Sequence, residues 1–422
     1  MEIIANYGNV LLILAIVFGV FMAWGIGAND VANAMGTSVG SGAVTIKQAI
    51  VIAVIFELSG AILAGGEVTA TIRKGILDAA LFVNEPHLLV YGMLASLLAA
   101  GAWLLIASSF GLPVSTTHSI VGAIVGFGAV GIGVDAVAWS EVFKIVISWI
   151  ASPVLAGVIS YTLFRSIQNL IIDTKNPFGN AKKYVPYYMF LVGFVVSLVT
   201  IFKGLKHVGL SFNTLTSYSL SIGFGLLVAI IGTLLIRNIH LDPDENKDFY
   251  YASMERVFGV LMIITAAAMA FAHGSNDVAN AIGPLAAIYS VIESGGAIGS
   301  KSVLPLWILL VGGGGIVIGL ITYGHKVIAT IGTGITQLTP SRGFAATLAA
   351  AATVVIASGT GIPVSTTQVL VGAVLGVGLA RGVAALDTRV INRIFLSWIV
   401  TLPAGAFMSI LFFFALKGAF GA

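Results

Sequence analysis

Long apolar runs separated by short polar connections make up most of this 422-residue chain. Most runs are about 20 residues long, the length that a helix needs to cross the hydrocarbon of a membrane. They do not show the alternation over about 10 residues that is typical of the strands of a membrane barrel. The pattern predicts twelve helical segments, at 8–27, 46–65, 88–110, 113–134, 142–164, 186–202, 216–236, 255–274, 303–323, 344–360, 362–380 and 391–416.

Composition supports the same fold class. The chain is 58% hydrophobic and only 9% charged, whereas soluble domains carry about 25% charged residues. We therefore expect an all-α polytopic membrane protein with a lipid bilayer as its surroundings. The absence of cysteine excludes disulfides and thiolate metal sites.

The positions of lysine and arginine predict the orientation of the chain, because these residues concentrate in cytoplasmic connections. With the N-terminus outside, thirteen of the 20 lysines and arginines fall inside and six fall outside. We therefore expect a multi-pass protein of the cell (plasma or inner) membrane with both termini outside.

Two motifs occur twice. "GANDVANA" (27–34) returns as "GSNDVANA" (274–281), 247 positions later, and "GLPVSTTHSIVGAIVGFG" (111–128) returns as "GIPVSTTQVLVGAVLGVG" (361–378), 250 positions later. This spacing predicts a first repeat at 1–165, intervening spans and a cytoplasmic linker at 166–253, and a second repeat at 254–422. An odd number of predicted segments separates the copies, so we expect inverted-topology repeats with a substrate site near the membrane midplane.

The first motif places Asp30 and Asp277 at the ends of apolar runs. A carboxylate within a span is costly, so it normally faces a partner or a cavity. The glycines before each aspartate predict a broken helix, whose exposed carbonyls suit a cation. We expect a cation site with neutral ligands from Asn29, Asn33, Asn276 and Asn280; the alternative is that the aspartates only cap helices.

The second motif carries Pro-Val-Ser-Thr-Thr at 113–117 and 363–367. Proline suits the first turn of a helix and Ser or Thr its N-cap. Each motif therefore predicts a helix start, either in a full span or in a re-entrant hairpin, whose N–H groups and dipole favour an anion. The hydroxyl groups that we expect at this anion site belong to Ser115, Thr116, Thr117, Ser365, Thr366 and Thr367. The alternative is that they only cap helices.

Glu57 lies in the middle of the second predicted span and has no evident counterpart in the second half. It is a candidate for a coupling carboxylate, a proton carrier or a structurally paired acid. We expect no enzyme, because there is no Cys/His metal cluster and no nucleotide-binding loop in a strand–helix context. Energy for transport would then come from an ion gradient or from the substrate's own gradient.

The two "NDVANA" strings, each followed by Pro-Val-Ser-Thr-Thr, together with "TPSRGF" at 339–344, resemble the inorganic phosphate transporter (PiT) family. The resemblance covers roughly 10–165 and 255–415. It implies phosphate uptake coupled to Na⁺ or H⁺, an inverted repeat of about twelve spans, and a homodimer. Glu57 matches a glutamate in the second span of the family, and the corresponding residue of the second half is missing near Thr347.

The sequence thus predicts a cation-coupled symporter of inorganic phosphate that works by alternating access. Phosphate would be held by the six hydroxyl residues with Asn33 and Asn280, and Na⁺ by Asp30 and Asp277 with Asn29 and Asn276. We prefer Na⁺ as the co-transported ion and expect no other cofactor and no nucleic-acid partner. The alternatives are a proton-coupled phosphate or sulfate permease and an anion channel.

Overall fold

The computed structural model describes residues 2–110, 112, 114–205, 209–240, 247–298, 304–324, 338–382 and 388–421. Within these ranges the chain is almost entirely helical, and the one β-type contact is an isolated bridge between Leu77 and Val137. The all-helical fold class is confirmed.

Every predicted span coincides with a helix. The main helices are α1 (Glu2–Asn29), α2 (Val31–Gly40), α3 (Ile46–Ala64), α4 (Gly66–Lys74), α5 (Pro86–Ser109), α6 (Thr116–Phe127), α7 (Trp139–Ile167), α8 (Pro177–Phe202), α9 (Thr214–Arg237), α10 (Lys247–Glu293), α11 (Leu306–Gly319), α13 (Pro340–Gly359), α14 (Thr366–Arg381) and α15 (Thr388–Phe420). Short π-helical turns extend α6 to Ile132, α7 to Ile172 and α11 to Gly324. Ten helical segments of the described chain are long and apolar enough to cross a membrane. The two predicted segments at 113–134 and 362–380 are the shorter helices that begin with α6 and α14.

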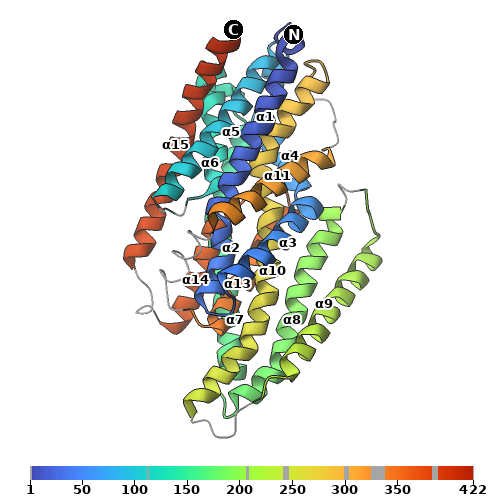
Figure 1. Ribbon diagram of the computed structural model, residues 1–422, viewed down its shortest axis with the longest axis vertical. Coiled ribbons are helices and arrows are strands. Elements are labelled where there is room, and N and C mark those ends of the chain that lie inside the picture. Colours follow the sequence, from blue (N-terminus) through green and yellow to red (C-terminus); the bar gives the residue numbers. More distant parts are fainter. Residues whose placement is uncertain are drawn as a thin grey trace.

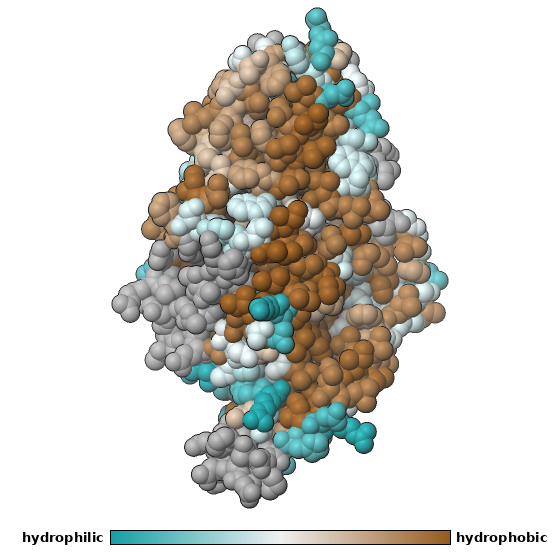
Figure 2. All heavy atoms as spheres, viewed as in Figure 1, coloured by the Kyte–Doolittle hydropathy of each residue, from teal (hydrophilic) through white to brown (hydrophobic). Residues whose placement is uncertain are grey.

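The helices form an elongated bundle with both termini at one end (Figure 1). α1 packs against α5, α10 and α11, and α8 pairs with α9. Apolar side chains cover most of the face seen in Figure 2, and hydrophilic residues lie mainly toward its two ends. This distribution fits an integral membrane protein, whose lipid-facing surface is as apolar as its core.

The two halves of the sequence pack in a reciprocal way. The short helix α6 of the first half packs against α15 of the second, and α14 of the second half packs against α7 of the first. The helices that precede α6 and α14 in the sequence also cross between the halves: α5 contacts α15, and α13 contacts α7. Each half therefore supplies a short helix that is enclosed by the last helix of the other half.

The helix break that the sequence predicted at the second aspartate is absent, and the break at the first is only slight. α10 runs without interruption through Gly274 and Asp277. Between α1 and α2 only Asp30 departs from helix, and it keeps right-handed helical dihedrals. The glycines serve close packing instead: a Cβ on Gly27 would lie 1.9 Å from the Ile316 carbonyl oxygen, and one on Gly274 would lie 2.2 Å from that of Glu57. Small residues at such contacts are typical of membrane helices.

Candidate functional site

Each motif aspartate is hydrogen-bonded to the threonine that begins a short helix of the same half. Thr116 at the start of α6 donates to Asp30 Oδ2 at 2.6 Å. Thr366 at the start of α14 donates to Asp277 Oδ2 at 2.8 Å. The four side chains are almost completely buried. The same contact thus occurs at corresponding positions of both sequence repeats.

The starts of α6 and α14 are joined to each other by a second reciprocal pair of hydrogen bonds. Thr117 donates to the Val364 carbonyl at 3.0 Å, and the Thr367 hydroxyl, whose one proton is shared with Asp30 Oδ1, lies 3.3 Å from the Val114 carbonyl. The first N–H groups of a helix have no acceptor within the helix. Two such sets of N–H groups therefore lie close together at the centre of the molecule.

Ser115 and Ser365 are the N-cap residues of these helices. Their hydroxyl oxygens accept hydrogen bonds from the backbone N–H groups of His118 at 3.2 Å and Gln368 at 3.3 Å. This is the usual N-cap interaction, which stabilises a helix by about 1 kcal/mol. The capping role that the sequence left open is thus present, and each serine hydroxyl still has a proton to donate.

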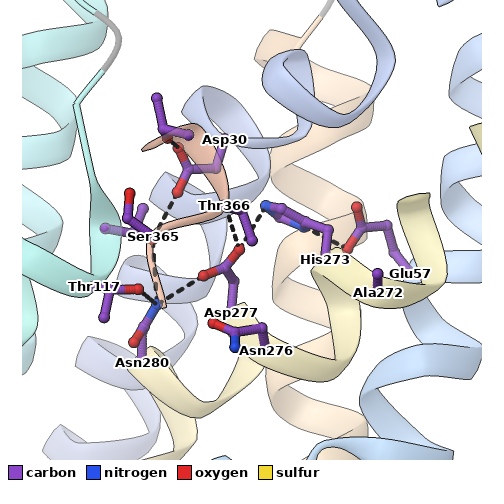
Figure 3. A network of polar contacts seen from close by, with 12 residues as sticks. Asp30, Glu57, Thr117, Ala272, His273, Asn276, Asp277, Asn280, Ser365 and Thr366 are labelled. Carbon is purple, nitrogen blue, oxygen red and sulfur yellow. Dashed lines mark hydrogen bonds and ion pairs between the residues drawn. The ribbon is translucent and has the colours of Figure 1, made fainter. Parts of the chain in front are cut away.

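Asn280 and Thr367 link the two halves of the site. The Asn280 side-chain nitrogen lies 3.1 Å from Asp277 Oδ1 and 3.2 Å from the hydroxyls of both Thr116 and Thr117, and its two N–H groups are shared among these three oxygens. Thr367 donates to Asp30 Oδ1 at 3.0 Å. Asp30 is therefore bonded to both short helices, whereas Asp277 is bonded to α14 and linked to α6 through Asn280. Figure 3 shows Asp277 and Asn280 on successive turns of α10, facing this cluster.

A buried histidine that the sequence analysis did not single out completes the cluster. His273 lies one turn before Asp277 on α10, and its Nε2 is 3.0 Å from Asp277 Oδ2. Its Nδ1 is 2.8 Å from Glu57 Oε2 on α3. Glu57 is thus connected to the aspartate through one imidazole (Figure 3). The signal was its position directly before "GSNDVANA", where the first repeat has the apolar residue Ile26.

The predicted neutral ligands separate into three groups. Asn29 donates to Ser108 at 2.8 Å, and Asn276 donates to the corresponding Ser358 at 3.2 Å. Asn280 lies within the central cluster, as described above. The side chain of Asn33 lies outside the described residues. Thr347, where the sequence lacks a second glutamate, is within 2.8 Å of the Thr37 hydroxyl.

Several buried oxygens of the site have no hydrogen-bond partner among the described residues. They are the side-chain carbonyls of Asn29, Asn276 and Asn280 and the Oε1 atom of Glu57. In addition, Asp30, His273 and Asp277 each offer one ligand atom within 4.8 Å of the others. Unpartnered buried acceptors are costly, and a cation would satisfy them. The arrangement therefore combines oxygen ligands for cations with hydroxyl and N–H donors for an anion.

Comparison with known proteins gives a consistent result. The sequence pattern that defines the phosphate transporter family matches residues 26–409. The chain is 55% identical to a Haemophilus influenzae protein provisionally named a phosphate permease, over the full length of both. It is 44% identical to the chloroplastic inorganic phosphate transporter 2-1 of Arabidopsis thaliana, over 94% of this chain and 70% of that protein. A solved structure described as the sodium-dependent phosphate transporter superposes with a TM-score of 0.89 at 41% identity, covering 97% of this chain and 99% of the other.

Proposed function

Because the chain belongs to the phosphate transporter family, we propose that it is a Na⁺-coupled symporter of inorganic phosphate in the cell membrane. The observation that carries this proposal is the pairing of Asp30 and Asp277 with the first threonines of α6 and α14. This pairing brings acidic groups, which can bind cations, and helix N-termini, which can bind an anion, into one buried cluster.

Phosphate would lie between the starts of α6 and α14. Helix N-termini favour anions because their N–H groups and dipoles point toward them. The hydroxyls of Thr116, Thr117, Thr366 and Thr367 and the amide of Asn280 would add donors, and Ser115, Ser365 and Asn33 complete the proposed set. The hydroxyls now bonded to aspartate oxygens or backbone carbonyls would turn toward the substrate when it enters.

Na⁺ would be bound by the aspartates, with Asn29 and Asn276 as neutral ligands. Hard cations prefer carboxylate and carbonyl oxygens, and unpartnered oxygens of this kind are present on both asparagines. A carboxylate at membrane depth costs at least about 2.5 kcal/mol, and a bound cation offsets that cost. The sodium-dependent relative in the structural comparison supports the same ion.

Proton coupling is a second candidate, and the Glu57–His273–Asp277 contacts favour it. Carboxylate and imidazole groups in contact form a path along which a proton can move, as in many transporters. Glu57 would then be the coupling residue. A sulfate permease or an anion channel could have the same fold. Transport experiments distinguish these two alternatives from a phosphate symporter.

Alternating access would follow from movement of the two halves around the central cluster. The repeated hydrogen bonds and the reciprocal packing of α6 on α15 and α14 on α7 support two equivalent halves of opposite orientation, with α6 and α14 in re-entrant hairpins. We further propose both termini outside and a homodimer. Inverted repeats of this kind commonly carry substrates at the midplane.

The test is uptake of labelled phosphate into liposomes that contain the purified chain, with Na⁺ and pH gradients imposed separately. Na⁺-driven uptake without a pH gradient supports the proposal. Uptake driven by pH alone favours proton coupling, and equal competition by sulfate favours a broader anion permease. Flux that persists without any cation gradient, in the chain and in Asp30→Asn, would indicate a channel.

A further inference from the structure

A carboxylate from α10 is bound to the start of α13. Glu255 Oε2 accepts a hydrogen bond from the Ser341 backbone N–H, and Oε1 accepts one from the Ser341 hydroxyl, both at 2.7 Å. Thr339, the N-cap residue of α13, makes no side-chain capping bond to the helix. Because helix N-termini favour negative charge, Glu255 takes over this capping role and thereby holds α13 to α10.

The next residue of α13 extends this contact to α14. Arg342 lies within electrostatic range of both Glu255 and Arg381, the last residue of α14. The carboxylate attracts Arg342, whereas the two arginines repel each other. Loss of the negative charge would therefore leave the repulsion between α13 and α14 without this compensation. A single carboxylate thus favours close packing of three helices.

α2 is held to the same part of α13. The hydroxyls of Thr37 and Thr347 are 2.8 Å apart, and a Cβ on Gly343 would lie 3.4 Å from the Ser41 Cβ. α2 begins directly after Asp30, and α13 ends just before the second Pro-Val-Ser-Thr-Thr. The two helices therefore extend from the central cluster toward the end of the bundle away from the termini (Figure 1), and their contacts close that direction.

The opposite end of the bundle has no equivalent of these polar contacts, although the sequence repeat supplies corresponding positions. At the repeat spacings of 247 and 250, these positions are Gly8 and Tyr91 for Glu255 and Ser341, and Pro284 and Leu97 for Thr37 and Thr347. Glycine has no side chain, and the side chains of proline and leucine neither donate nor accept hydrogen bonds. Polar contacts can be exchanged for water at small net cost, whereas exposing apolar contacts is unfavourable.

We propose that the Glu255–Ser341 contact is a gate, which closes the path from the central cluster to the end of the bundle away from the termini. This inference rests on the proposed transport function and deepens it by assigning the residues that open one side. When the contact breaks, water satisfies both the carboxylate and the freed N–H group. α13 then separates from α2 and α10, while the packing at the other end stays closed.

The first experiment is thiol labelling of the purified full chain, which has no cysteine of its own. Ser38→Cys is the reporter, because Ser38 is buried on α2 beside Thr37. Adding Glu255→Gln should raise its rate of reaction with a maleimide about tenfold, since the charge that strengthens the contact is lost. Ser341→Ala removes only the hydroxyl and should have a smaller effect. Arg256→Gln, at an exposed neighbouring position, is the control and should leave the rate unchanged. No increase with Glu255→Gln would overturn the proposal.

A second reporter separates opening of the gate from general loss of structure. Ala286 is also buried and lies on α10 beyond Asp277, on the side of the central cluster that faces the termini. The labelling rate of Ala286→Cys should not change when Glu255→Gln is added. An equal increase at both reporters would mean that the contact only stabilises the fold, and the gate would be rejected. Labelling requires no transport, so a selective increase at Ser38→Cys in a chain without Na⁺-driven phosphate uptake would contradict the proposed function but not the gate.

Discussion

The hydroxyl of Thr367 donates to Asp30 Oδ1 at 3.0 Å, although the two residues are 337 positions apart. Thr116, on the other side of Asp30, donates to the second carboxylate oxygen at 2.6 Å. One aspartate of the first repeat is therefore hydrogen-bonded to the short helices of both halves. Asp277 has a similar position, with Thr366 and Asn280 as donors.

This relationship predicts that neutralising either aspartate weakens Na⁺ binding. Asp30→Asn and Asp277→Asn should each raise the Na⁺ concentration for half-maximal phosphate uptake about 10- to 100-fold, because hydrogen bonds or contacts to a buried charge are worth about 1.5–3 kcal/mol. Asp173→Asn, at an exposed position after α7, is the control. Unchanged Na⁺ dependence in both site variants would contradict the cation assignment.

A second prediction concerns the threonine hydroxyls. Thr366→Val keeps the shape of the side chain but removes the donor to Asp277, so the KM for phosphate should rise by about tenfold, as expected for the loss of about 1–1.5 kcal/mol. Thr366→Ser restores a hydroxyl and should recover most of the affinity. The measurement is initial uptake at several phosphate concentrations. A serine variant as defective as the valine variant would show that the hydroxyl is not the important group.

The third prediction concerns the contact between Glu57 and His273. Removing one member of a buried pair leaves the other without compensation, so Glu57→Gln and His273→Gln should each destabilise the protein by about 3 kcal/mol. The double variant should lose less than the sum of the two, since residues in contact are energetically coupled. Thermal unfolding in detergent measures all three proteins. Strict additivity would mean that the 2.8 Å contact contributes nothing to stability.

A fourth prediction follows from the helix contacts at the motif glycines. Gly27→Ala and Gly274→Ala place a methyl group against backbone oxygens of Ile316 and Glu57, so each should destabilise the fold by about 1–3 kcal/mol. Gly314→Ala, in α11, meets nothing within 4 Å and should be neutral or slightly stabilising because alanine favours helix. Equal unfolding temperatures for all three variants would show that the close packing is not important.

The apolar pattern predicted the helices well because a span of about 20 residues is a local property of the sequence. The repeated motifs singled out Asp30, Asp277 and the two threonine pairs, and the structure brings these side chains together; their role in binding remains a prediction. The course of α10 was predicted wrongly: Gly274 suggested a break, whereas its small size lets α10 approach α3. The link from His273 to Glu57 spans 216 positions, and such distant contacts depend on packing that no local pattern contains.

The proposed division of the chain at 1–165, 166–253 and 254–422 remains a prediction. The packing of the helices shows that these segments do not fold as separate bodies. Neither repeat is an independent body in the described structure, because α6 and α14 are each enclosed by helices of the other half. The repeats are units of sequence, whereas the unit of packing contains parts of both.

The interlocking of the halves also has an evolutionary consequence. A single ancestral repeat with this architecture would have needed a second copy of itself to surround its short helix. Because both copies of the motifs lie in one chain, a position can differ between them. His273 opposite Ile26, and His118 opposite Gln368, are places where the two copies differ at corresponding positions around the site. A single chain thus permits the two halves to differ at these positions while both keep the threonine and aspartate framework.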